Sequence, residues 1–381
     1  MVAQDGPVSG WKHLFQRAIA AAPDRLHFAA HSHHLWPDAS WLGQQAAWDD
    51  AARLADRKWG RVMDEIWPAA QAEVATELRL PDPSTVVFAA NTHELLLRVV
   101  SAMAPRRPLR ILATDGEFHS FRRQSLRWEE AGTARVTRVP IAQIVATAAG
   151  GDFDLIVASH VQFGTGHIFD GIADLAALAR PDGPWVLIDG YHGFMAVETD
   201  LSVVADRLFY VAGGYKYAMA GEGVGFLHAP PGFGLRPELT GWYAEFEDLA
   251  LPPGTIGYAP DARRFLGATF DPSGLYRFLA VREMLAREGL TTGAINAHVA
   301  PLRAQLLDQF PLDAEQINPA APDAPQARFV ALRSRHAAAW QAALAAEEIV
   351  TDVRGDVLRI GLGLYQDSRD VARLGAALAR L

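Results

Sequence analysis

One lysine lies in a glycine-rich loop between two apolar runs, in the stretch "FYVAGGYKYAMAGEGVGFLHAP". This residue, Lys216, is one of three lysines in a chain that has 32 arginines; the other two are Lys12 and Lys58. An arginine stays protonated, whereas a lysine amine can lose its proton in a shielded site and form a Schiff base. Lys216 is therefore a candidate for amine chemistry, and Lys12 and Lys58 are interpreted as surface residues.

An acidic residue ends another apolar run. In "PWVLIDGYHGF", Asp189 follows five apolar residues, and His192 comes three residues later. A charge buried at the end of a strand needs a cationic or hydrogen-bonding partner. An aspartate that accepts backbone N–H bonds within a turn is an equally good interpretation of this stretch by itself.

Three further stretches place polar side chains at the ends of apolar runs. In "VVFAANTHELLLRVV" a strand runs into a helix, whose first N–H groups could hold a phosphate together with Thr92 and His93. An ordinary helix cap is the alternative. His119 in "ILATDGEFHSFRRQ" and Gln162 in "LIVASHVQFGTG" occupy similar positions and are weak signals individually.

The combination of these residues is more specific than any one of them. A phosphate site at a helix start, an acid at a strand end and a lysine 27 residues later are the parts needed to hold pyridoxal 5'-phosphate (PLP). They would act as phosphate anchor, partner of the pyridine nitrogen and Schiff-base lysine. The sequence therefore predicts PLP as the cofactor.

The elements that must position these residues follow from hydrophobic periodicity. Seven short apolar runs alternate with helical stretches, at 85–90, 109–115, 134–140, 153–160, 184–190, 207–214 and 223–229. This pattern predicts an α/β fold with a mostly parallel seven-stranded sheet and helices on both faces. The last two runs are too close for a helical crossover, which predicts one antiparallel strand.

We expect three parts along the chain. Residues 1–25 form an N-terminal helix that packs on the small domain, residues 26–288 the large cofactor-binding domain, and residues 289–381 a small α+β C-terminal domain. Between the first helix and the first sheet strand, the stretch that follows Pro37 predicts helix, in two segments.

Composition excludes several classes of function. The net charge of −9 makes nucleic acid an unlikely partner, because phosphate backbones bind basic surfaces. The absence of cysteine excludes disulfides, thiolate metal sites and cysteine nucleophiles. No long apolar segment indicates a membrane span, and no N-terminal signal is visible, so we expect a cytoplasmic protein.

The loop "HFAAHSHHLWPD" contains four histidines, His27, His31, His33 and His34. Imidazole is a common metal ligand, but neither thiolates nor an HExxH-like spacing accompany these residues. We predict no metal here, and a loop that instead feeds side chains into the mouth of the site.

With these stretches together, the chain resembles the class V aminotransferase family of PLP-dependent enzymes of fold type I, which includes kynureninases and cysteine desulfurases. "EFHS" is similar to the motif whose histidine stacks on the pyridine ring, which implies that role for His119. "DGYH" is similar to the family's Asp-x-x-His/Gln, so Asp189 would pair with the pyridine nitrogen and His192 would lie near the cofactor. Gln162 matches a polar contact to the cofactor.

The resemblance assigns roles to the remaining candidates. "GYKYAMAGEGVGF" resembles the lysine loop of kynureninases, which implies Lys216 as the covalent anchor and Tyr215 as a phosphate contact. "RRFLGATFDPSGLYRF" resembles the segment whose threonine, here Thr269, reaches the phosphate of the neighbouring subunit, so a homodimer is implied. "DVLRIGLGLYQDSRDVARL" resembles the motif whose arginine, here Arg359, grips the substrate carboxylate.

The resemblance leaves the reaction open. Cysteine desulfuration is excluded, because a persulfide-carrying cysteine has no counterpart in this chain. We predict an aminotransferase acting on a small amino acid, with a kynureninase-like Cβ–Cγ hydrolase as the alternative. A PLP-fold binding or regulatory protein without turnover is a third possibility, because fold does not fix function.

Overall fold

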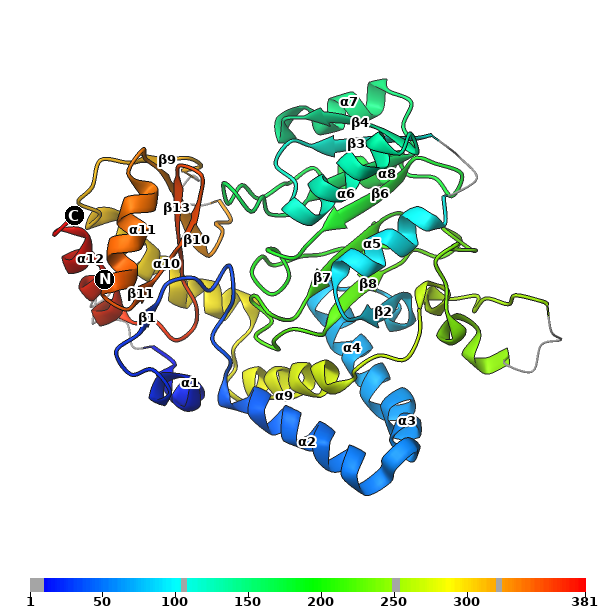
Figure 1. Ribbon diagram of the computed structural model, residues 1–381, viewed down its shortest axis with the longest axis horizontal. Helices are drawn as coiled ribbons and strands as arrows, with labels where there is room; N and C mark the ends of the chain where they lie inside the picture. The colour runs from blue at the N-terminus through cyan, green and yellow to red at the C-terminus, as the bar shows by residue number, and fades with distance from the viewer. Residues whose placement is uncertain (1–9, 104–107, 249–253, 320–323) are drawn as a thin grey trace.

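The computed structural model describes residues 10–103, 108–248, 254–319 and 324–381. These residues form two lobes (Figure 1). The larger lobe surrounds a seven-stranded sheet, and the smaller lobe contains the C-terminal part of the chain together with the first helix. No helix among the described residues is long and apolar enough to cross a membrane.

The seven predicted strands all form, and they make one sheet of the order β2-β8-β7-β6-β5-β3-β4. The strand β8 runs antiparallel to both of its neighbours, and the other neighbouring pairs are parallel, which confirms the predicted mixed topology. The strands are β2 (Val86–Ala89), β3 (Leu109–Thr114), β4 (Ala134–Val139), β5 (Leu155–Ser159), β6 (Trp185–Asp189), β7 (Phe209–Gly213) and β8 (Gly225–His228).

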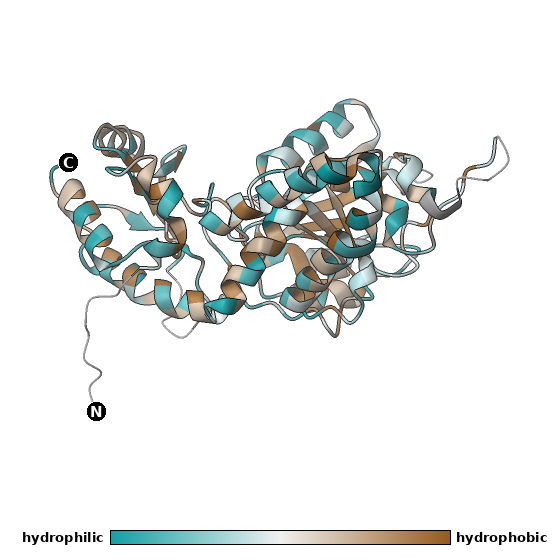
Figure 2. Cartoon of the chain, turned by 90° about the horizontal axis from the view of Figure 1, so that it is seen from below, coloured by the Kyte–Doolittle hydropathy of each residue, from teal (hydrophilic) through white to brown (hydrophobic). Residues whose placement is uncertain are grey.

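The central strands are buried along almost their whole length, because helices cover the sheet. Every residue of β5, β7 and β8 is buried, as expected for strands that read as continuous apolar runs. Figure 2 shows these hydrophobic strands between the helices of the large lobe. The helices that alternate with the strands are α5 (Thr92–Ser101), α6 (His119–Glu130), α7 (Ile144–Gly150) and α8 (Ile172–Leu178).

The helical region after Pro37 is confirmed, with more interruptions than the two expected segments. The long helix α2 (Asp38–Leu54) ends at Ala55, whose φ is +52°. A 3₁₀ turn, α3 (Lys58–Arg61), a π-helical turn and α4 (Trp67–Leu78) follow. Helix α2 runs beside α9 (Ser273–Arg287) along one side of the large lobe (Figure 1).

The small lobe is built on a four-stranded antiparallel sheet of the order β12-β13-β10-β9. Its strands are β9 (Glu315–Gln316), β10 (Phe329–Arg333), β12 (Asp352–Arg354) and β13 (Val357–Gly361). Its helices are α10 (Thr292–Asp308), α11 (Ala337–Ala346) and α12 (Ser368–Leu378). A two-residue strand, β1 (Leu26–His27), pairs in parallel with β11 (Ile349–Val350). Leu26 and His27 therefore lie with the small lobe, although the large domain was expected to begin at residue 26.

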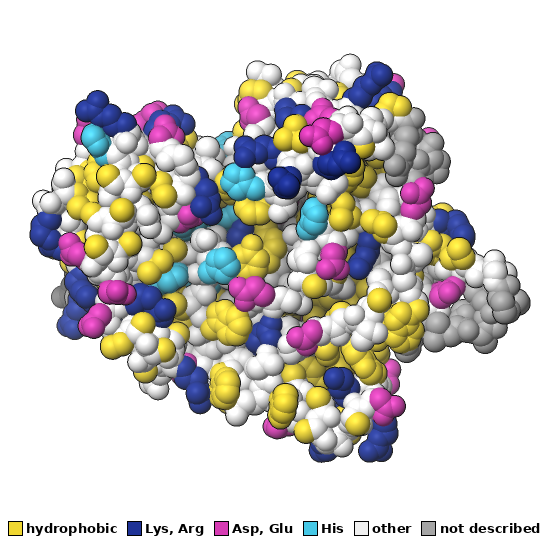
Figure 3. Space-filling view, in the orientation of Figure 1, with side chains coloured by type: hydrophobic (Ala, Val, Ile, Leu, Met, Phe, Trp, Pro, Cys, Tyr) yellow, Lys and Arg dark blue, Asp and Glu magenta, His cyan; other side chains and the backbone are white. Residues whose placement is uncertain are grey.

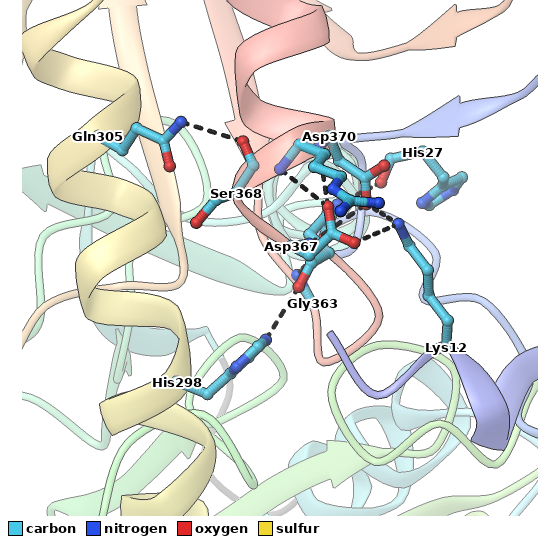
Figure 4. Close-up of polar contacts among 10 residues, drawn as sticks. Lys12, His27, His298, Gln305, Gly363, Asp367, Ser368 and Asp370 are labelled. Atoms are coloured by element: carbon cyan, nitrogen blue, oxygen red, sulfur yellow. Dashed lines mark hydrogen bonds and ion pairs between the residues drawn. The ribbon is translucent and has the colours of Figure 1, made fainter. Parts of the chain in front are cut away.

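The N-terminal segment lies against the small lobe. The 3₁₀ turn at 12–15 and α1 (Gln16–Ala20) follow Trp11, whose N–H donates to the carbonyl of Leu364 at 3.2 Å. The Lys12 ammonium lies 2.7 Å from Asp367 and 2.8 Å from Asp370, both at the start of α12 (Figure 4). Two carboxylates and one backbone bond therefore hold this segment in place.

The contact of Lys12 is testable by its contribution to stability. Since the Lys12 side chain is 41% exposed, we expect Lys12→Ala to lower the free energy of unfolding by only about 0.5–1 kcal/mol. The melting temperature should fall by roughly 1 to 3 °C. Lys58→Ala is the matched control, because Lys58 makes no ion pair in the part of the chain that the structure describes. Equal melting temperatures of the two variants would contradict the role given to Lys12.

Candidate active site

The carboxyl ends of β3, β5, β6 and β7 open into one cavity of about 260 Å³. Such an edge is where open α/β sheets bind ligands. Six of the residues singled out from the sequence line this cavity: Thr92, His93, Asp189, His192, Tyr215 and Lys216. The structure thus brings together residues that lie far apart in the sequence.

Lys216 is almost completely buried, with 5% of its surface exposed. Its Nζ atom lies 3.0 Å from Nε2 of His192 and 4.7 Å from the centre of the Tyr191 ring. Burial lowers the pKa of Lys216 to about 7, and the positive charge of Arg359 acts in the same direction, against the opposing effect of Asp189. Near neutral pH this amine is therefore available in its unprotonated form.

Asp189 ends β6 and faces the same cavity. Its Oδ1 atom accepts the backbone N–H of Tyr191 at 3.0 Å. Burial raises the pKa of Asp189, while the Tyr191 N–H and the Lys216 charge oppose this shift. The carboxyl group thus gains from a cation or an N–H donor placed in the cavity.

The N-terminus of α5 forms another side of the cavity. Asn91 caps this helix by accepting the N–H of Glu94 at 3.0 Å, and Thr92 and His93 follow it into the lining. Strand β8 passes so close that a Cβ on Gly225 would lie 2.7 Å from the carbonyl carbon of Asn91. The helix start and the strand can meet only because residue 225 is a glycine. The first N–H groups of a helix lack partners within the helix, so such a terminus can bind an anion.

The histidine loop borders this cavity through aromatic contacts. His33 stacks on Tyr215 at 4.7 Å between ring centres, and Tyr215 also packs against Tyr191 at 4.7 Å. His27 instead bonds the Tyr365 hydroxyl at 2.6 Å, and His34 bonds the carbonyl of Leu35 at 2.8 Å. Figure 3 shows histidine side chains gathered between the two lobes.

His31 of the same loop is fully buried and stacks on Phe329, with 4.8 Å between ring centres. Its Nε2 atom lies 3.6 Å from Asp352. Within the described ranges, no three His, Asp or Glu side chains gather as a metal site would require.

Three other predicted residues lie outside the cavity lining. His119 is exposed at the start of α6, where its Nδ1 atom is 2.9 Å from Arg122. Gln162 is buried and directs its amide nitrogen to the Thr114 hydroxyl at 3.5 Å. Thr269 is exposed, as a residue with a role in a second subunit would be, so that role stays a prediction.

Arg359 is buried at the contact between the lobes and does not line the cavity. Its guanidinium donates to Asp352, its neighbour across the β12–β13 pair, and to the carbonyl oxygen of Phe163 in the large lobe. The ring of Phe163 lines the cavity, and the guanidinium carbon lies 5.7 Å from the centre of that ring. The predicted carboxylate-binding arginine is thus separated from the cavity by one aromatic ring. Its Nε atom has no hydrogen-bond partner among the residues that the structure describes.

Glu117, Phe118 and Tyr191 are among the lining residues that the sequence analysis missed. The ring of Phe118 has its centre 5.4 Å from the Lys216 Nζ atom. Glu117 and Phe118 belong to the "EFHS" stretch from which only His119 was chosen, and Tyr191 lies inside "DGYH". Their positions after strand ends were the available signal.

Comparison with known proteins shows what this fold and site resemble. The chain is 29% identical to isopenicillin N epimerase of Streptomyces clavuligerus over 333 residues, which cover 79% of this chain and 81% of that protein. No family model matches the chain.

Solved structures resemble the fold closely. The cysteine desulfurase of Thermococcus onnurineus NA1 superimposes with a TM-score of 0.80 over 100% of this chain and 99% of that chain, at 16% identity. A lysine-to-alanine mutant of C-DES with glycine covalently linked to the PLP cofactor gives a TM-score of 0.79 over 97% and 98% of the two chains, at 19% identity. At such identities the likeness shows the fold.

The chain is similar in sequence and in fold to PLP-dependent enzymes of the class V aminotransferase-like family of fold type I. The resemblance and the fold class predicted from the sequence are therefore confirmed. PLP is the cofactor of this family, as the sequence predicted.

The residues that line the cavity fit PLP in their chemistry. A buried amine, a carboxylate with a raised pKa and the N-terminus of α5 surround one cavity. They match the aldehyde, the ring nitrogen and the phosphate of PLP in chemical type.

The low pKa of Lys216 predicts a pH dependence of stability. In the cofactor-free protein, the unfolded chain binds a proton at Lys216 that the folded chain does not, between pH about 7 and about 10.5. Stability therefore rises with pH across this window. Lys216→Met should stabilise the cofactor-free protein below pH 7 by on the order of a few kcal/mol, and this gain should shrink as the pH rises through the window.

Denaturant unfolding at several pH values measures this effect. Lys58→Met is the control, because Lys58 is only partly buried. A stability difference between the Lys216→Met variant and the wild type that does not change with pH would contradict the unprotonated state of Lys216.

Proposed function

We propose that this protein is a PLP-dependent enzyme that removes the α-proton of an amino acid with the amine of Lys216. The observation that carries this proposal is the burial of Lys216 in the same cavity as Asp189, with its pKa lowered to about 7. A general base works best when its pKa is close to the operating pH. Lys216 satisfies this condition.

Several residues of the cavity have a role in this proposal. When bound, PLP supplies an electron sink that makes the α-proton of an amino acid acidic. Asp189 holds a proton at the ring nitrogen, and Tyr215 and the start of α5 hold the phosphate. Lys216 takes up the α-proton, and His192, 3.0 Å away, can exchange a proton with it.

Arg359 and Phe163 mark the substrate end of the site in this proposal. A guanidinium fork fits a carboxylate geometrically. The unpartnered Nε atom of Arg359 supports this role, while the bond to Asp352 occupies part of the fork.

We propose epimerisation as the reaction, because the relative that matches most of the chain is named an epimerase. In an epimerisation Lys216 and its neighbour His192 remove the proton from one face of the α-carbon and return a proton to the opposite face of the same carbon. Transamination, which the motifs favoured, is the second candidate, because the same amine can deliver the proton to a different carbon. A kynureninase-like hydrolysis and a protein without turnover are further outcomes that the test below distinguishes.

One type of incubation, repeated with each substrate, distinguishes these reactions. The purified protein is supplied with PLP in D₂O, and isopenicillin N, a panel of L-amino acids and kynurenine are added separately. We expect exchange of the α-proton for deuterium together with the opposite configuration at Cα, measured by NMR and chiral chromatography. A keto acid would indicate transamination, anthranilate would indicate hydrolysis, and bound PLP without any exchange would indicate a protein without turnover.

The role of Lys216 is tested by borohydride reduction followed by peptide mass spectrometry. The wild type should carry the reduced cofactor on the peptide that contains Lys216. The Lys216→Ala variant should carry no cofactor on this peptide and should lose α-proton exchange by at least about 1000-fold, because it lacks both the covalent anchor and the base. An unchanged adduct in Lys216→Ala would overturn the proposal.

We also propose a cytoplasmic homodimer in which Thr269 reaches the phosphate in the neighbouring subunit. Thr269 is exposed and lies in the segment between the 3₁₀ turn at 262–265 and α9. Thr269→Ala should weaken PLP binding about 10- to 150-fold, the effect of one hydrogen bond to a charged group. The mass in solution should remain that of a dimer, and a monomeric wild type would contradict this arrangement.

A further inference from the structure

Glu117 is a buried carboxylic acid at the floor of the cavity, and the function proposed above does not use it. Only 3% of its surface is exposed. Its Oε1 atom accepts the Thr114 hydroxyl at 2.6 Å and the Ser159 N–H at 2.9 Å, and its Oε2 atom accepts the Ser159 hydroxyl at 2.6 Å. One side chain thus ties together the carboxyl ends of β3 and β5.

These bonds place Glu117 near Asp189, the proposed partner of the ring nitrogen. Ser159 is the register partner of Asp189 in the β5–β6 pair, and Glu117 and Asp189 both line the cavity. Glu117 forms no ion pair with Lys, Arg or His in the described part of the chain. Two carboxylic acids therefore share this end of the cavity. Only Asp189 has a proposed partner on the cofactor, the ring nitrogen.

The electrostatics of Glu117 follow from this position. Burial raises the pKa of Glu117 to about 7, the charge of Asp189 acts in the same direction, and the bonds from Ser159 and Thr114 oppose the shift. A buried carboxylic acid beside a second carboxylate can hold a proton near neutral pH. Its charge therefore depends on whether a cation is present in the cavity.

We propose that Glu117 is a positioning residue that supports Asp189: its carboxylate adds negative potential at the floor of the cavity and so helps to keep the cofactor's ring nitrogen protonated. The inference rests on the proposed binding of PLP. The oxygen atoms of Glu117 are occupied by Thr114 and Ser159, so Glu117 does not bind the ring nitrogen directly. It acts on the ring nitrogen through its electrostatic field and by holding the ends of β5 and β6. A negative charge near a cationic acid raises the pKa of that acid.

The test is a pH titration of the visible absorption of the PLP-loaded protein, between about pH 5 and 10. Glu117→Gln keeps the shape of the side chain and removes its charge. We expect the midpoint of the absorption change to fall by about one pH unit or more, as the loss of a buried unit charge predicts. The other titratable groups that face the cavity are the same in both proteins: His93, Asp189, Tyr191, His192, Tyr215, Lys216 and Glu222.

Asp115→Asn is the matched control, because Asp115 is an exposed carboxylate two residues away. Its midpoint should equal that of the wild type. If Glu117→Gln does not fold, Thr114→Val replaces it: this variant removes one hydrogen bond that stabilises the Glu117 carboxylate and should shift the midpoint in the same direction by a smaller amount.

The borohydride adduct on Lys216, measured on the same samples, distinguishes a failure of the role given to Glu117 from a failure of the proposed function. With the adduct present in every protein, equal midpoints of Glu117→Gln and wild type would overturn the role of Glu117. A wild type without the adduct would overturn the proposed function itself. A lower midpoint with a normal adduct supports the proposal, because a purely structural role of Glu117 would not move the titration.

Discussion

The burial of one amine in a cavity that it shares with two carboxylic acids is the constraint on which the site depends. Moving the Lys216 amine out of water costs free energy. The ends of β6 and β7 must therefore be held rigidly to keep this amine buried. A Cβ on Gly213 would lie 2.4 Å from the Tyr191 hydroxyl, so the lysine loop packs against Tyr191 only because glycine ends β7. The low pKa of Lys216 is the direct consequence of this packing.

The antiparallel strand β8 explains why the lysine loop and the helix start meet. After Lys216 the chain turns back and enters β8 at the same edge of the sheet where β7 ends. The first residue of β8, Gly225, pairs with Ala89 at the end of β2, directly before the α5 helix. A helical crossover would have placed the next strand's beginning at the opposite edge. One antiparallel strand thus brings the predicted phosphate anchor next to the predicted base.

Much of the large lobe could be predicted because its strands are continuous apolar runs and its key residues follow them directly. Lys216 and Asp189 were found in this way. The sequence could not decide which of several neighbouring side chains enters the cavity: α6 begins at His119, so that Phe118, one residue earlier, faces Lys216 instead. Glu117 was missed because its partners, Thr114 and Ser159, come from two different strands. The pairing of β1 with β11 involves two residues on each side, which is too short for periodicity to reveal.

The small lobe comes near the cavity through Arg359, which it presents to the large lobe. Asp352 and Arg359 face each other on neighbouring strands, and this pair fixes the guanidinium while a second bond joins it to Phe163 across the lobes. A buried ion pair adds little net stability, but removing one partner is costly. Asp352 therefore acts mainly by holding the direction of Arg359. Since Phe163 belongs to both the arginine contact and the cavity wall, any change in the relative position of the lobes alters the distance between the guanidinium and the cavity that contains Lys216.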